Sequence, residues 1–179
     1  VSLDDTIRIH RGFEWQLVDV EHDRSQLRGF IVKAGLSELG TDRLLTVDEA
    51  RAAGKPVNIA VVLALWKVAD PDLCAFIEGM DAPASPDKGR LSLSFEVGFD
   101  DYDIAVLPNG ATNLSLASQV IPPDSPDFAR YDRLLRVNGG KGIYGKDAHV
   151  ARILVGNIIP LGAGIVTVPA AAVKGLTAI

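Results

Sequence analysis

The segment 91–97 alternates strictly between apolar and polar residues, and this period of two predicts a half-buried β-strand. Its apolar positions are Leu91, Leu93, Phe95 and Val97, and its polar positions are Ser92, Ser94 and Glu96. The polar face carries two hydroxyls and a carboxylate, which are groups found in nucleophile sites. Serine and glutamate are also ordinary residues on a solvated strand face, so the pattern alone leaves both interpretations open.

Other apolar runs predict further strands, which are expected at 15–20, 28–34, 57–66, 104–107, 150–154 and 164–168. The run 57–66 does not alternate, and it is therefore expected to be covered on both faces. Segments 81–89, 108–110 and 122–126 are rich in turn residues and predict loops.

Capping patterns predict three helices. Thr46 and Glu49 have the spacing of a capping box, and Gly54 follows the last expected helical residue. The Asp-Pro pair at 70–71 and the Ser-Pro pair at 125–126 have the form of helix starts, and the helices they open are expected to end at Gly79 and Asn138. Helices and strands together indicate an α+β fold with a mostly β core.

The composition fits one domain with an appended arm. The chain has 179 residues, of which 47% are hydrophobic and only 6% aromatic, so an aliphatic core is expected. We expect residues 1–27 to form an N-terminal arm and residues 28–179 to form a single domain.

Several function classes are disfavoured. A net charge of −5 argues against nucleic acid as a partner. The sequence contains no apolar run long enough to span a membrane, and its start lacks the basic and apolar segments of a signal peptide. Cys74 is the single cysteine, which excludes an intrachain disulfide and a cysteine-based zinc site. No cofactor is predicted.

A serine nucleophile needs a base, and histidine is the usual one. The chain has three histidines, His10, His22 and His149, and their spacing predicts no metal site. His10 lies in a charged segment and is expected at the surface. His22 has carboxylates on both sides in the sequence that could orient its ring, and His149 precedes an expected strand. His22 and His149 therefore remain as candidate bases.

Two further segments resemble ligand sites, but each is better explained without a ligand. Segment 140–147 (GKGIYGKD) nearly matches nucleotide-binding patterns, but Asp147 replaces the hydroxyl residue and the flanking elements are in the wrong order. It is therefore predicted to be a glycine hairpin. Segment 99–103 (FDDYD) offers carboxylates to a divalent cation, but such clusters are commonly solvated.

The order of these segments resembles the capsid-maturation (prohead) proteases of tailed bacteriophages. The resemblance rests on 29–32 (GFIV), 45–50 (LTVDEA), 54–57 (GKPV), 93–97 (LSFEV) and 162–170 (GAGIVTVPA). It covers the chain loosely from about 28 to 172. It implies a mostly antiparallel, β-barrel-like protease domain with about three flanking helices, similar to herpesvirus assembly proteases.

The resemblance implies a serine endopeptidase with Ser94 as nucleophile. Family members usually place a histidine after the GKPV segment, whereas residues 58–63 here contain none. The base would then be His149 or His22, and backbone N–H groups of the 139–145 loop would stabilise the oxyanion. An alternative is a minor capsid or decoration protein that keeps the protease fold without the chemistry.

The resemblance also implies the partners, which are the phage scaffold and major capsid proteins. The net charge and the lack of a long apolar run predict no nucleic acid and no membrane as partners. The expected locations are the virion or procapsid interior and the host cytoplasm. The oligomeric state stays open between a monomer and a homo-oligomer.

Overall fold

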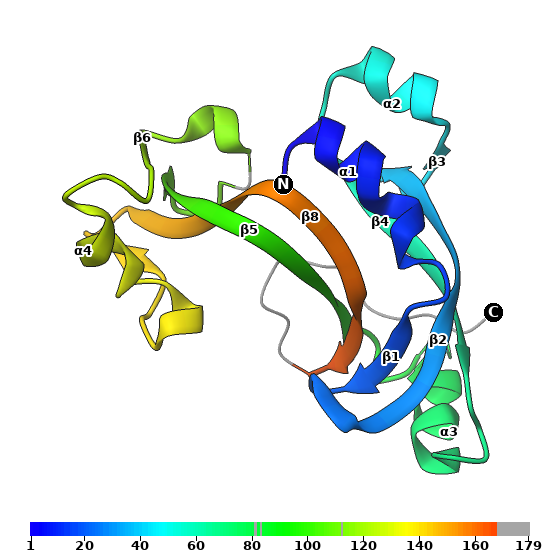
Figure 1. The fold of residues 1–179 in the computed structure, drawn as a ribbon. Coiled ribbons are helices and arrows are strands. Elements are labelled where there is room, and N and C mark those ends of the chain that lie inside the picture. The colour runs from blue at the N-terminus through cyan, green and yellow to red at the C-terminus, as the bar shows by residue number, and fades with distance from the viewer. Residues whose placement is uncertain (81, 83, 112, 168–179) are drawn as a thin grey trace. The chain divides into compact units, whose positions relative to one another are not determined.

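The computed structural model describes residues 1–80, 82, 84–111 and 113–167 (Figure 1). Its helices are α1 (Leu3–Ile9), α2 (Val47–Ala53), α3 (Pro71–Met80) and α4 (Phe128–Asp132), with short 3₁₀ turns at His10–Phe13, Leu114–Leu116 and Arg136–Asn138. Its strands are β1 (Leu17–Val20), β2 (Asp23–Glu38), β3 (Leu44–Leu45), β4 (Val57–Leu65), β5 (Ser92–Pro108), β6 (Gln119–Ile121), β7 (Ile143–Tyr144) and β8 (Ala148–Val166). No helix within the described ranges has the length and apolar character needed to cross a membrane.

The α+β class expected from the sequence is confirmed, but the barrel-like closure is wrong. The described strands form one mixed sheet in the order β3-β2-β1-β8-β5-β6, with β4 paired to β2 and β7 paired to β8. Strand β1 runs parallel to β8, whereas β2 is antiparallel to β1, β3 and β4. The sheet stays open, since no pairing among the described strands joins β6 at one end to β3 or β4 at the other.

The chain divides into two compact units, and strands β5 and β8 each contribute to both. One unit comprises Leu3–Gly98 and Ile159–Ile179, and the other comprises Val1–Ser2 and Phe99–Ile158. The segment predicted as an N-terminal arm contributes α1 and β1 to the first of these units. We call the first the N-terminal unit and the second the Phe99–Ile158 unit.

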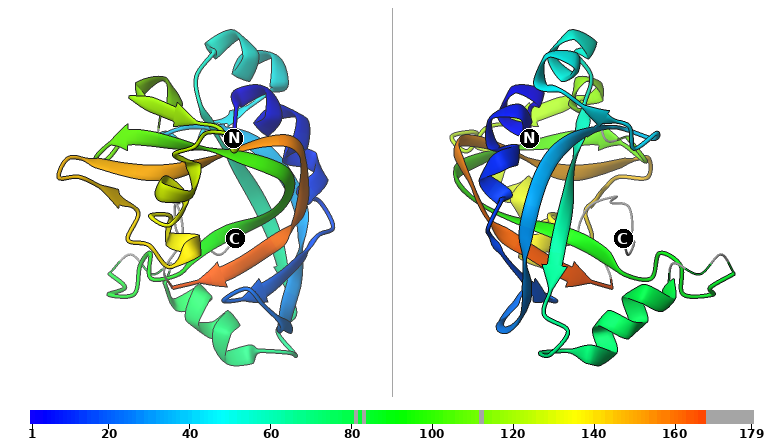
Figure 2. Two further views of the ribbon diagram at one scale, coloured as in Figure 1. Left: turned by 60° about the vertical axis from the view of Figure 1, so that its left-hand side comes forward. Right: turned by 90° about the vertical axis from the view of Figure 1, so that its right-hand side faces the viewer.

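The N-terminal unit packs α1 and α2 against its sheet. Ile7 of α1, Leu36 of β2 and Ala50 of α2 form one buried cluster, and Figure 2 shows the two helices beside each other near β2 and β4. No capping or periodic pattern predicted α1, which lies in the predicted arm. His10, expected at the surface, is buried, and its Nδ1 donates to the Ile7 carbonyl at 2.7 Å.

Strand β4 confirms the strand expected at 57–66, but the expectation that both its faces are covered is wrong. It pairs with β2 alone among the described strands, and its residues are half-buried, with Val62 exposed. Neither face of β4 is therefore fully covered.

The Phe99–Ile158 unit has a separate apolar cluster, built on Ile104, Val106, Ile121, Tyr131, Leu135 and Val150. The helix predicted after Ser125-Pro126 is shorter than expected, since α4 ends at Asp132 and a 3₁₀ turn follows. The glycine hairpin predicted at 140–147 is confirmed, because Ile143 of β7 pairs with His149 of β8.

Strands β5 and β8 are longer than the sequence indicates. The strands expected at 91–97 and 104–107 belong to β5 from Ser92 onward, and those expected at 150–154 and 164–168 belong to β8 as far as Val166. The acidic segment 99–103 continues β5, and its Asp100 accepts hydrogen bonds from the backbone and side-chain amides of Asn157. Val168, Pro169 and Ala170 of the segment that resembles the protease family lie outside the described residues.

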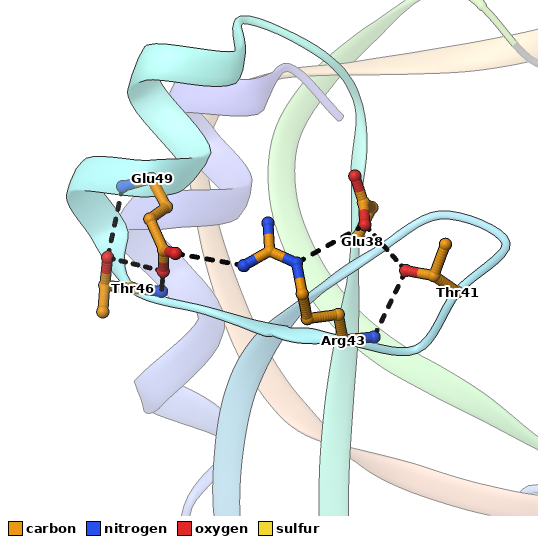
Figure 3. A network of polar contacts seen from close by, with 5 residues as sticks. All are labelled: Glu38, Thr41, Arg43, Thr46 and Glu49. Carbon is orange, nitrogen blue, oxygen red and sulfur yellow. Dashed lines mark hydrogen bonds and ion pairs between the residues drawn. The ribbon is translucent and has the colours of Figure 1, made fainter.

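The predicted capping box at the start of α2 is confirmed (Figure 3). Glu49 N–H donates to Thr46 Oγ1 at 3.2 Å, and Thr46 N–H donates to Glu49 Oε2 at 2.7 Å. Arg43 extends the network by bonding Glu49 Oε1 at 3.0 Å and lying 3.6 Å from Glu38. Gly54 ends the helix with a φ of 58°, as the sequence predicts.

Replacing the N-cap tests how far this network stabilises the N-terminal unit. We expect Thr46→Ala to lower the free energy of unfolding by about 1 kcal/mol, because the Glu49 N–H loses its acceptor. Thr46→Ser keeps the hydroxyl and should stay close to wild type in urea denaturation. Equal losses in the two variants would show that the methyl group, and not the cap, provides the stabilisation.

Candidate functional site

A two-residue turn between β1 and β2 carries His22. Val20 pairs with Asp23, which leaves Glu21 and His22 as the loop, with φ values of 53° and 60°. Two consecutive positive φ values are typical of a type I′ turn, whose twist matches a β-hairpin. Histidine tolerates this region better than glutamate does, so Glu21 needs additional support.

Strand β8 and the residue after it provide that support. Glu21 N–H donates to the Ile165 carbonyl at 2.9 Å, and Glu21 Oε1 accepts from the backbone N–H and the hydroxyl of Thr167 at 2.8 and 3.0 Å. Figure 1 shows this turn beside the C-terminal end of β8. Hydrogen bonds of both the backbone and the side chain of Glu21 therefore hold the turn against the end of β8.

The fixed turn brings His22 to Glu96 of β5. His22 Nδ1 lies 3.0 Å from Glu96 Oε1, across 74 positions of the sequence. The other carboxylate oxygen, Oε2, accepts a hydrogen bond from Arg24 of β2. The His22 side chain is 39% exposed and that of Glu96 is 19% exposed. The ring is thus accessible to solvent on one side and bonded to a carboxylate on the other.

Asp19 of β1 completes a cluster that we call the acid–imidazole cluster: Asp19, His22, Arg24 and Glu96. The Asp19 side chain is only 2% exposed, and its Oδ1 has no hydrogen-bond partner in the described part of the chain. Arg24 Nε lies 3.8 Å from Asp19 Oδ2. Burial raises the pKa of the Asp19 carboxyl and the nearby Glu96 adds to this, while His22 and Arg24 partly offset it.

Two glycines of β8 keep the space around the cluster open. A Cβ on Gly164 would lie 2.8 Å from His22 Nδ1 and 3.0 Å from Asp19 Oδ1. A Cβ on Gly162, whose φ is 153°, would lie 2.7 Å from the Leu17 carbonyl oxygen and 3.4 Å from Glu96 Oε2. Any larger residue at Gly164 would collide with the imidazole and the buried carboxylate.

Ser94 shares a face of β5 with Glu96. Phe95 between them packs its ring against buried Phe13 at a centroid distance of 4.5 Å, so the residues on either side of it point the other way. Ser94 is half-buried, whereas Ser92 is buried. Among the residues that the structure describes, no hydrogen bond joins Ser94 Oγ to an imidazole.

The other sequence-predicted site elements belong to the Phe99–Ile158 unit. His149 lies in β8 opposite Ile143, and the segment 139–145 contains β7 and the residues that join it to the last 3₁₀ turn. His149 as a base and this loop as an oxyanion site stay predictions.

The sequence pointed to His22 but not to its true carboxylate partner. Its neighbours Glu21 and Asp23 were the expected orienting groups, yet Glu21 bonds Thr167 and Asp23 Oδ1 bonds Ser25. Glu96 was visible only as part of a polar strand face. Asp19 and Arg24 were missed, although an aspartate inside the short apolar run 17–20 was a signal that a buried carboxylate had a purpose.

Comparisons of this chain with protein-family models, curated proteins and solved structures found no match. The resemblance to the capsid-maturation proteases therefore rests only on the short sequence segments between residues 29 and 170 described above.

The raised pKa of Asp19 predicts a specific pH dependence. Between its ordinary pKa of 3.8 and the raised native value, the native state binds more protons at Asp19 than the unfolded state does. That contribution to stability is complete below 3.8 and is lost as the pH rises through the native pKa. The free energy of unfolding of wild type minus that of Asp19→Asn should therefore fall as the pH rises from about 3.8.

Urea denaturation at a series of pH values measures this difference. Asp72→Asn, at the exposed start of α3, is the matched control for removing one carboxylate. A difference between wild type and Asp19→Asn that is constant with pH, or that rises over this range, would contradict the effect of burial on Asp19.

Proposed function

We propose that this chain is a serine endopeptidase of the capsid-maturation type, with Ser94 as nucleophile, His22 as general base and Glu96 as the carboxylate that orients His22. The observation that carries the proposal is the 3.0 Å contact between His22 Nδ1 and Glu96 Oε1. It supplies the base–acid half of a triad, in which the acid, Glu96, lies on the strand that also bears Ser94.

The chemistry follows from which nitrogen Glu96 engages. A carboxylate that accepts from Nδ1–H leaves Nε2 as the proton acceptor. Nε2 takes the proton of the Ser94 hydroxyl while Oγ attacks the peptide carbonyl, and the imidazolium then protonates the leaving amine. Water hydrolyses the acyl-enzyme, with His22 again acting as the base.

The serine and the imidazole must approach each other for this reaction. His22 lies on a turn with a partly exposed side chain, and Ser94 lies on a strand fixed from its opposite face by Phe95. Motion of the ring can therefore close the distance when substrate binds. Catalytic hydrogen bonds are often loose without substrate and tighten in the complex.

The proposal extends to partners and place only through the sequence resemblance. Substrates would be the scaffold and major capsid proteins, cut in the procapsid interior or the host cytoplasm. His22 is favoured over His149 as the base because it has a carboxylate partner, Glu96, on the strand that carries the proposed nucleophile.

A structural capsid protein without the chemistry is the second candidate. Two observations favour it. No hydrogen bond joins Ser94 Oγ to an imidazole among the described residues, and residues 58–63 of β4 contain no histidine. In that case the acid–imidazole cluster would serve stability alone.

A fluorophosphonate probe distinguishes the two candidates without knowledge of the substrate, because it labels only an activated serine hydroxyl. We expect the purified, metal-free chain to form an adduct that peptide mass spectrometry locates at Ser94. His22→Gln should lower the labelling rate by about 100-fold or more, because a general base contributes 10²–10⁴-fold.

Ser94→Ala should form no adduct, whereas Ser92→Ala, two positions away on the same face, should still be labelled. Loss of labelling in His149→Gln but not in His22→Gln would assign the base to His149. Absence of any adduct on the folded wild-type chain would reject the enzyme in favour of the structural protein.

A further inference from the structure

We propose that Asp19, His22 and Glu96 bind a divalent transition-metal ion such as Zn²⁺, and that the bound metal blocks the base function of His22. The binding site stands on its own geometry, while the inhibitory effect rests on the proposed serine-protease function.

The three side chains already converge. One ligand atom from each lies within 4.8 Å of the other two, and His22 Nδ1 is 3.0 Å from Glu96 Oε1. A tetrahedral zinc ion with bonds of about 2.1 Å holds its ligand atoms about 3.4 Å apart. The cluster therefore needs to contract by about 1.4 Å at most, which is within reach of a partly exposed imidazole on a turn.

Asp19 Oδ1 is the independent sign of a ligand. It is a carboxylate oxygen buried beneath the surface without a hydrogen-bond donor in the described part of the chain. Buried carboxylates are normally paired or coordinate a metal. The point above Gly164 that a Cβ would fill lies 3.0 Å from Oδ1 and 2.8 Å from His22 Nδ1, so both atoms face the same space.

Arg24 neutralises only half of the carboxylate pair. It bonds Glu96 through Oε2 and lies nearest Asp19 at Oδ2. On the other side, Asp19 Oδ1 has no hydrogen-bond partner in the described part of the chain, and Glu96 Oε1 bonds His22 Nδ1, so neither oxygen is paired with Arg24. Two carboxylates and one guanidinium leave a net charge of −1 with neutral His22, and this charge favours a positive ion.

The donor set indicates the class of metal. One imidazole nitrogen and two carboxylate oxygens suit zinc or manganese, whereas calcium and magnesium prefer oxygen alone. Three protein ligands would leave a position open for water.

A bound metal would remove the free nitrogen that proton transfer needs. A metal on His22 Nδ1 displaces the proton that Glu96 accepts, and in the neutral ring this proton moves to Nε2, the nitrogen that would otherwise accept the proton of Ser94. The imidazole can then no longer act as the base toward Ser94. The metal-bound form is thus the inhibited state of the proposed protease.

Isothermal titration of the EDTA-treated, dialysed chain with ZnCl₂ tests the site. We expect one ion per chain, with the dissociation constant raised at least tenfold in Asp19→Asn and unchanged in Asp72→Asn. Should Asp19→Asn misfold, as judged by circular dichroism, His22→Gln on the exposed turn and Gly164→Ala provide the same test. Absence of stoichiometric binding, or equal affinity in the folded variants, would overturn the proposal.

Fluorophosphonate labelling with and without ZnCl₂ separates the two proposals. Zinc should suppress the labelling of wild type. At the same concentration it should change the labelling of Asp19→Asn little relative to that variant without zinc. Zinc binding without labelling in the metal-free chain would reject the protease and its inhibition but leave the metal site standing. Labelling without zinc binding would reject the metal site and leave the protease standing.

Discussion

The anchoring of the β1–β2 turn to the end of β8 is the constraint on which the candidate site depends. Glu21 and His22 occupy left-handed backbone conformations that cost about 1–2 kcal/mol each. Three hydrogen bonds, one donated by Glu21 to Ile165 and two accepted by Glu21 from Thr167, offset this cost at about 1 kcal/mol each. Without these hydrogen bonds the His22 ring would have no fixed position, and the contact with Glu96 would be formed in only some of its conformations.

The polar groups gathered behind this turn are stabilised only in part. Arg24 compensates one oxygen of Glu96 and lies near one oxygen of Asp19, while Asp19 Oδ1 is buried without a hydrogen-bond partner among the described residues. A fold optimised for stability alone would not keep such an oxygen. Gly164 supports the same conclusion, because the Cβ of an alanine there would collide with His22 and Asp19. Both features point to a site kept for chemistry or for a ligand.

The sequence predicted local features well because local forces determine them. The capping box of Thr46 and Glu49, the glycine hairpin before β8 and the apolar face of β5 were all visible as short patterns. It did not predict α1, which has seven residues and is stabilised by packing on Leu36 and Ala50. It also missed the open sheet edge, because strand order is set by long-range pairing that no local pattern records.

The candidate site shows the same division. His22 and Ser94 were recognised from their chemistry, but the partner of His22 lies 74 residues away and its sequence neighbours bond elsewhere. Positive φ at a glutamate and a histidine carries no sequence signal as strong as Asn-Gly would. The parallel pairing of β1 with β8, which places Gly164 beside Asp19, also could not be predicted from a local pattern.

The most direct test of this account is a ¹⁵N nuclear magnetic resonance measurement of the His22 ring in the metal-free chain, at a pH where the ring is neutral. The account predicts that Nδ1 carries the proton and that Nε2 is free to accept one, with this preference lost in Glu96→Ala. A neutral ring protonated mainly at Nε2, or a tautomer ratio that Glu96→Ala leaves unchanged, would contradict the pairing on which the site is built.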